Sequence, residues 1–157
     1  MPITLQRAAD SDARSIFDMQ VQAFQPLLDR YQDFDTNPAN ETIDRVIGRI
    51  NDPNSAYYMI MESDAPVGAI RIVWKEEARY CISPLFIKPD CQGRGIAQLA
   101  IAEAERMYPQ AITWELVTLL EEARNCYLYE KLGYRKTGEQ TKLNENATLI
   151  HYKKPTT

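Results

Sequence analysis

The sequence is poor in the residues from which metal and nucleophilic sites are usually built. It has a single histidine, His151, and three cysteines, Cys81, Cys91 and Cys126, with no CxxC pair among them. Zinc sites need several such ligands at close spacing, so this pattern argues against a metal site. His151 lies in the alternating segment ATLIHYKK, and we interpret it as a structural residue of a strand rather than a catalytic one.

Excess positive charge and long apolar runs are missing as well. The net charge is −4, without the basic surplus that nucleic-acid binding requires. No apolar stretch approaches the roughly 20 residues of a membrane helix. The opening MPITLQRAADSDARS has no basic region followed by an apolar run, so we expect no signal peptide. These absences predict a cytoplasmic protein with reduced thiols and with no nucleic-acid or membrane partner.

The composition that remains is ordinary for a globular protein. The chain has 157 residues, of which 45% are hydrophobic and 25% are charged. This length suits one domain with a sizeable core, so we predict a single domain over residues 1–157. The oligomeric state is left open, a homodimer being one option.

Apolar periodicity predicts an α/β protein with a mixed sheet. Strands are expected at 3–8, 56–63, 67–75, 79–88, 111–118, 134–140 and 147–154, and helices at about 10–24, 42–50, 95–108 and 121–132. Asp10 or Ser11 is the expected cap of the first helix. The order is β-α-α-β-β-β-α-β-α-β-β, with an antiparallel meander first and a parallel pair around the central helix. Pro84 inside the fourth strand predicts a bulge, because proline has no N–H to donate.

The segment LFIKPDCQGRGIAQLA joins a strand to a helix through two glycines, with no capping Asp, Ser or Thr. A helix start carries free N–H groups and the positive end of the dipole. Glycines at 93 and 95 let an anion approach this backbone closely. The P-loop pattern has no match. The dinucleotide pattern GxGxxG would need a third glycine where Gln98 stands, and the preceding meander is wrong for it. The interpretation of this segment as a purely structural turn stays open.

A third anion-binding pattern, Q/R-x-x-G-x-G/A, is matched at every fixed position by Gln92, Gly93, Arg94, Gly95, Ile96 and Ala97. LFIKP precedes it and NCYLYEKLGYRKTGE follows it. With this context the chain resembles the GNAT superfamily of acetyl-CoA-dependent N-acetyltransferases. The resemblance covers essentially the whole chain and is strongest over residues 85–139. It implies acetyl-CoA as co-substrate, no metal, and the coenzyme pyrophosphate at residues 92–98, including Gln98.

The resemblance also implies roles around the thioester. The strand that ends in Leu85, Phe86 and Ile87 is expected to splay from the TWELVT strand and to bind the pantetheine arm and thioester oxygen through its backbone. Members often have an asparagine where this chain has Glu122, so Asn125 is the candidate for that cofactor contact.

Tyr129 of the YEK segment is the candidate acid for the leaving thiolate, because a tyrosine stays protonated at neutral pH. A half-buried packing role for Tyr129 is the alternative.

The base that deprotonates the amine is the least determined part. The strand RYCISPLFI has no carboxylate, where family members often carry a glutamate. Glu115 on the neighbouring strand is the candidate through a water, Glu62 is a further option, and a water chain needs neither. The acceptor is a small-molecule or peptide amine, and acidic residues between 24 and 54 would suit a cationic one. A non-catalytic acyl-CoA-binding sensor is the alternative function, although it would not need Tyr129.

Overall fold

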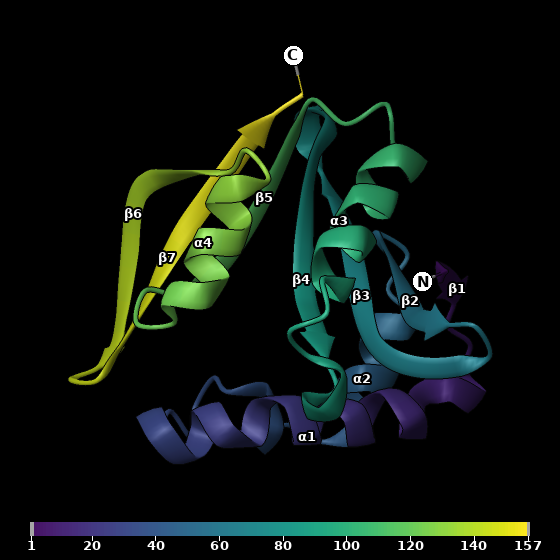
Figure 1. Ribbon diagram of the computed structural model, residues 1–157, viewed down its shortest axis with the longest axis horizontal. Helices are drawn as coiled ribbons and strands as arrows, with labels where there is room; N and C mark the ends of the chain where they lie inside the picture. Colours follow the sequence, from purple (N-terminus) through teal and green to yellow (C-terminus); the bar gives the residue numbers. More distant parts are fainter. Residues whose placement is uncertain (1, 157) are drawn as a thin grey trace.

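A seven-stranded mixed sheet runs through the computed structural model, which describes residues 2–156 (Figure 1). Its strand order is β1-β2-β3-β4-β5-β7-β6, and only β4 and β5 run parallel. The strands are β1 (Ile3–Arg7), β2 (Ser55–Glu62), β3 (Ala65–Lys75), β4 (Arg79–Ile87), β5 (Thr113–Leu119), β6 (Arg135–Asn144) and β7 (Ala147–Pro155). The helices are α1 (Ala13–Tyr31), α2 (Ile43–Ile50), α3 (Ile96–Met107) and α4 (Ala123–Lys131). The predicted fold class and element order are confirmed.

Each face of the sheet carries its own apolar core. Alternate side chains of β2 divide between the two: Tyr58 and Ile60 pack with α3, whereas Tyr57 and Met59 pack with α1 and α2. Since both faces are covered, β2 is buried along almost its whole length. This explains the nearly continuous apolar run AYYMIM, which a half-exposed strand would replace by strict alternation.

A bulge interrupts β4 at Pro84, where the sequence predicted one. Ile82 pairs with Ile72 and Leu85 with Ile70, so Ser83 and Pro84 together oppose Arg71 alone. The Arg71 side chain donates to the Ser83 carbonyl at 3.2 Å, which gives this carbonyl a partner outside the ladder. The same guanidinium donates to Ser55 Oγ at 3.2 Å and to Asp52 Oδ2 at 2.7 Å, and is therefore held on three sides.

Beyond the bulge, the extra residue in β4 exchanges the faces of the sheet to which odd-numbered and even-numbered side chains point. Before the bulge, Ile82 packs in the core beneath α3; after it, Phe86 packs in the core beneath α1, although both numbers are even. A one-residue insertion exchanges the two faces because side chains alternate with period two. The bulge therefore sets which backbone and side-chain groups of Leu85–Ile87 face each side of the sheet.

The first helix is longer than predicted, and its start differs. It begins at Ala13 after a 3-10 turn at Asp10–Asp12, so neither Asp10 nor Ser11 caps it. It runs beyond Phe24 and through Pro26 to Tyr31, whose side chain is buried. Local signals favoured an end near the proline, but tertiary contacts of the last turn extend the helix past it. The final hairpin also has a tighter turn than expected, because β6 continues to Asn144.

None of the helices within residues 2–156 is both long and apolar enough to cross a membrane.

Candidate active site

The parallel strands β4 and β5 are paired only at their beginnings. Arg79 pairs with Thr113, Tyr80 with Trp114, and Cys81 with Glu115; no later pair joins the two strands within the described residues. Both strands continue but diverge, with α3 in front of one arm and α4 in front of the other (Figure 1). We call this opening the fork. The predicted splaying of the two strands is confirmed, and it leaves the β5-facing backbone edge of Leu85–Ile87 outside the ladder.

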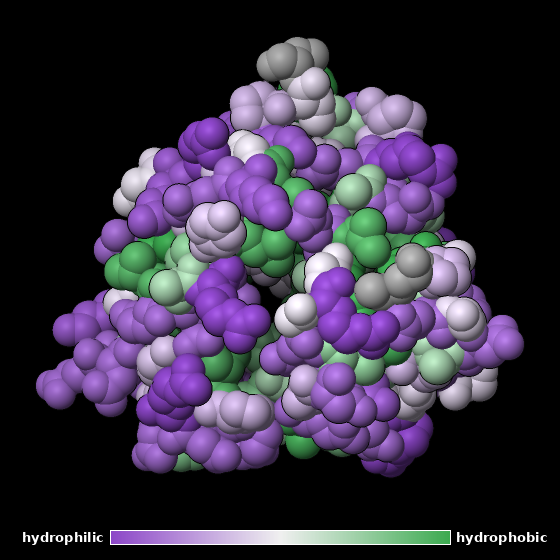
Figure 2. All heavy atoms as spheres, in the orientation of Figure 1, coloured by the Kyte–Doolittle hydropathy of each residue, from purple (hydrophilic) through white to green (hydrophobic). Residues whose placement is uncertain are grey.

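The surface is hollowed at the fork. The space-filling view in the same orientation shows a depression near the centre of this face, between the regions that α3 and α4 occupy (Figure 2). Backbone groups at a sheet opening need partners when they are removed from water. A ligand that enters this hollow can supply them by adding to the β4 edge as a strand would.

The glycine turn lies at the start of α3. Gly93 and Gly95 have φ values of 78° and 79°, a left-handed conformation that glycine adopts without penalty. Gly95 is the residue before the helix, and no side chain caps this end. A Cβ built on Gly95 would meet no heavy atom within 4 Å, so the space beside this turn is open. The predicted uncapped helix start is confirmed; its role toward a phosphate stays a prediction.

Two side chains of the turn make contacts within the protein, and their predicted roles toward the coenzyme stay predictions. Gln92 donates to the Ile87 carbonyl at 3.0 Å and ties the turn to the end of β4. Arg94 forms an ion pair with Glu62 at the end of β2, so its charge is shared with that carboxylate. This pairing also commits Glu62, the further option for a base, to the rim of the turn.

A cation that sequence reasoning missed lies beside the turn. The Arg124 Nη2 atom would be 3.7 Å from a Cβ built on Gly93, so the side chain of Arg124, in the first turn of α4, reaches the glycine turn. A positive charge in the first turn of a helix opposes the helix dipole. This unfavourable placement was the one signal in the sequence that could have drawn attention to Arg124.

Tyr129 lies on α4 and packs against two other tyrosines. Its ring centroid is 6.3 Å from that of Tyr134 and 6.1 Å from that of Tyr152. Its hydroxyl makes no hydrogen bond within residues 2–156. Burial raises the pKa of Tyr129 to about 12, and the phenol is therefore protonated throughout the neutral range. A protonated donor without an internal partner is available to a ligand.

The start of α4 is joined to the end of α1. Glu122 accepts hydrogen bonds from Arg30 at 2.9 Å and from the Tyr31 hydroxyl at 2.5 Å. Glu122, which stands where the family often has an asparagine, is therefore engaged in contacts with α1. Asn125 is half-buried in the first turn of α4, and its side-chain amide makes no hydrogen bond with residues 2–156. That availability agrees with Asn125, and not Glu122, as the candidate cofactor contact.

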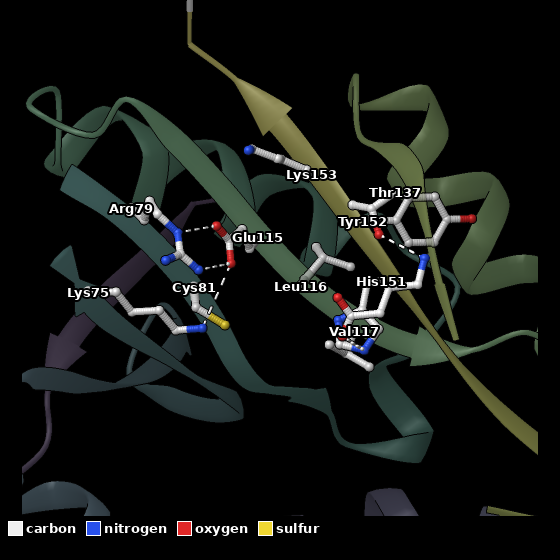
Figure 3. Close-up of a pocket in the computed structure, with 11 residues that line it drawn as sticks. Lys75, Arg79, Cys81, Glu115, Leu116, Val117, Thr137, His151, Tyr152 and Lys153 are labelled. Atoms are coloured by element: carbon white, nitrogen blue, oxygen red, sulfur yellow. Dashed lines mark hydrogen bonds and ion pairs between the residues drawn. The ribbon is translucent and has the colours of Figure 1, made fainter. Parts of the chain in front are cut away.

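Glu115 lies on the other face of the sheet, at the point where the fork begins. Its neighbours Trp114 and Leu116 pack in the core beneath α3 and α4, so Glu115 points the opposite way. It borders a cavity of about 290 Å³, whose charged and titratable lining residues are Lys75, Arg79, Cys81, Glu115, Glu139, His151, Tyr152 and Lys153 (Figure 3). We call this the Glu115 cavity.

Glu115 is held by an arginine. It accepts from Arg79 at 2.8 and 3.2 Å, and Lys75 Nζ lies 3.8 Å away. The Arg79 hydrogen bonds, with further attraction from Lys75 and Lys153, hold the pKa of Glu115 below its usual value. The carboxylate is thus ionised at neutral pH but is a weak proton acceptor, because protonating it would cost these contacts.

His151 lies on β7, in agreement with its predicted place in a strand. It lines the Glu115 cavity, and its Nε2 lies 3.3 Å from the Glu139 carboxylate. Three residues of β6, including Gly138 with a φ of 93°, oppose His151 on β7, and this irregularity brings Glu139 to it. No local pattern signals this, because the pair depends on the register of the final hairpin.

Comparison with known proteins agrees with this geometry. A family model described as Acetyltransferase (GNAT) domain matches residues 18–155. The chain belongs to the GNAT acetyltransferase family. The resemblance predicted from the Gln92–Ala97 motif is confirmed, and the protein is an acyltransferase.

Solved structures show the same fold. An acetyltransferase from Thermus thermophilus has a TM-score of 0.77 at 17% identity, over 99% of this chain and 97% of that one. The ribosomal-protein-S18-alanine N-acetyltransferase from Escherichia coli has a TM-score of 0.77 at 12% identity, over 98% and 94%. A spermidine N-acetyltransferase from Vibrio cholerae, in complex with CoA and spermine, has a TM-score of 0.76 at 17% identity, over 96% and 94%. No curated protein matches the sequence.

Proposed function

We propose that this GNAT acetyltransferase moves the acetyl group of acetyl-CoA to a primary amine, by direct attack in a ternary complex. The observation that carries the proposal is the fork, with an uncapped glycine turn on one arm and the protonated Tyr129 on the other. The Vibrio cholerae neighbour, which was solved with CoA and spermine, supports the binding of both a coenzyme and an amine.

The coenzyme is proposed to enter at the α3 side. Its pyrophosphate would accept from backbone N–H groups of the glycine turn and the uncapped start of α3, with Arg124 adding positive charge. Its pantetheine arm would add to the exposed edge of Leu85–Ile87, and a backbone N–H there would stabilise the oxyanion that forms when the amine attacks the thioester carbon. Such a donor costs no reorganisation, because the bulge at Ser83 and Pro84 already holds the strand.

The departing thiolate takes its proton from Tyr129. A free thiol has a pKa of about 8.5, so a phenol that is still protonated at neutral pH donates to the developing thiolate as the C–S bond breaks. The geometry supports this role because the hydroxyl is not engaged by any described residue.

Deprotonation of the amine is proposed to use water rather than a dedicated carboxylate. Glu115 is the carboxylate at the start of the fork, but its pKa is lowered by Arg79 and Lys75. A base whose pKa lies far below that of an ammonium near 10 drives the transfer poorly. Glu115 then orients water or substrate instead of holding the proton.

A thiol-release assay with acetyl-CoA and a panel of amines tests the function, with the acetylated product identified by mass spectrometry. Turnover of at least one amine supports an enzyme of this mechanism, and an amide on the amine nitrogen identifies the attacked atom. A protein that binds acetyl-CoA but acetylates no amine would favour the non-catalytic sensor.

A further inference from the structure

Three cationic side chains from three strands surround one carboxylate in the Glu115 cavity. Arg79, at the start of β4, donates two hydrogen bonds to Glu115, and Lys75, at the end of β3, lies 3.8 Å from it. Lys153 lies on β7 directly across from Glu115 in the strand register. Figure 3 shows Lys75 and Arg79 directed to Glu115, with Lys153 on the adjacent strand. One carboxylate cannot balance three cations.

The rest of the cavity removes only part of this surplus. Its other carboxylate, Glu139, is 69% exposed and lies beside His151 rather than beside the lysines. Lys153 has no ion-pair partner within residues 2–156. The cavity thus keeps about one unit of positive charge, although the chain as a whole carries −4. A surplus of about one matches a singly charged carboxylate better than a doubly charged phosphate.

The cavity lies on the acceptor side of the proposed reaction. Glu115 faces away from α3 and α4, the helices of the coenzyme side, and it marks the last paired position before the fork opens. A group bound here is therefore separated from the coenzyme by the sheet, while a chain extending from it along β4 reaches the fork.

Two of the acidic residues between 24 and 54 are neutralised inside the protein. Glu41 accepts two hydrogen bonds from Arg49 and one from Gln20. Asp52 is bound to Arg71. These two carboxylates therefore add little negative charge to the surface, whereas Asp29, Asp33, Asp35 and Asp44 form no ion pair within residues 2–156.

We propose that the Glu115 cavity binds a carboxylate of the acceptor, so that the substrate is an amine that also carries a carboxylate. This inference rests on the proposed function. Leu85 lies four residues beyond Cys81 on β4, or about 13 Å for an extended strand. The carboxylate and the attacked amine are therefore joined by an extended spacer, and Lys153 and Lys75 hold the carboxylate end.

The test compares two acceptors that differ only in this charge and whose chains match this span, 10-aminodecanoate and 10-aminodecanamide. The wild-type protein should acetylate the carboxylate with a kcat/KM at least about tenfold above that of the amide, mainly through a lower KM. The preference should shrink as salt is raised, because these charges are partly exposed. In Lys153→Gln the value for 10-aminodecanoate should fall toward that of the amide.

Lys136→Gln is the matched control. Lys136 is an exposed lysine on the adjacent strand, but it pairs with Tyr152, whose side chain is in the core on the α4 side. This variant should keep the full preference. Equal kcat/KM for the two acceptors in the wild type, or an equal loss on both in Lys153→Gln, would overturn the proposal.

Failure of the chemistry is distinguishable from failure of the cavity. If no amine is acetylated, the proposed function fails, and calorimetry with CoA present then decides the cavity. Tighter binding of 10-aminodecanoate than of the amide, lost in Lys153→Gln, would support the carboxylate site. Equal or absent binding of the two compounds would refute it.

Discussion

Replacing Gly68 by alanine should disturb the strand that forms one arm of the fork. Gly68 lies on β3 and pairs with Ile87 on β4. A Cβ built at this position would lie 2.2 Å from the Phe86 carbonyl oxygen and 3.1 Å from two atoms of Ile87. The nearest atom belongs to the backbone, so no rotamer change relieves the contact. To restore an ordinary contact distance, β4 must move by about 1 Å.

The expected cost follows from this displacement. Inserting a carbon into a well-packed site costs about 1–3 kcal/mol. Moving β4 also weakens hydrogen bonds of the β3–β4 ladder, at about 1 kcal/mol each. We expect Gly68→Ala to lower the free energy of unfolding by about 2–4 kcal/mol, equivalent to a fall in Tm of about 5–15 °C for a chain of this size. Coenzyme binding should weaken as well, because Leu85–Ile87 is the proposed pantetheine edge.

Urea unfolding followed by tryptophan fluorescence measures this, since Trp114 is buried in the core. Gly48→Ala in α2 is the matched control, because a Cβ there would meet nothing within 4 Å. It should stabilise the protein by about 0.5–1 kcal/mol, as expected for removing a glycine from a helix. A Gly68→Ala protein within about 0.5 kcal/mol of the wild type, with unchanged acetyl-CoA affinity, would refute the reasoning.

Three further predictions concern the coenzyme and the chemistry. Gly95→Val should abolish acetyl-CoA binding in calorimetry while circular dichroism shows a retained fold; unchanged affinity would exclude the turn as the pyrophosphate site. Tyr129→Phe should lower kcat by about 10²–10³-fold with little change in coenzyme affinity, and wild-type turnover would leave Tyr129 a packing residue. Because its pKa is lowered, Glu115 stays ionised at every pH of an assay run from about pH 6 to about pH 9.5. Log kcat/KM should therefore rise with pH at a slope of about one, following the fraction of the substrate that is free amine. Glu115→Gln should shift this profile little. If Glu115→Gln instead lowers kcat/KM by about 10²-fold and removes an inflection from the acid limb of the pH profile, Glu115 takes the proton through a water.

Local sequence signals were sufficient for the elements and for the glycine turn. The positions of Gly93 and Gly95, the absence of a capping side chain and the apolar stripe of α3 all act within a few residues of one another. The bulge at Pro84 was equally local, because it follows from a missing N–H. Local signals did not determine the length of α1, because its last turn is held by the contact of Tyr31 with Glu122, 91 positions away in sequence.

By itself, the sequence determined the order of elements, the mixed sheet and the family, because these depend on periodicity and on motifs of adjacent residues. Only the tertiary structure decided how the charges of the site are shared. Arg94 turns to Glu62, Arg79 holds Glu115, and His151 meets Glu139. The physical reason is that ion pairs between strands depend on register and on which face each side chain occupies. A shift of one residue in either strand would exchange those faces, and no local pattern records it.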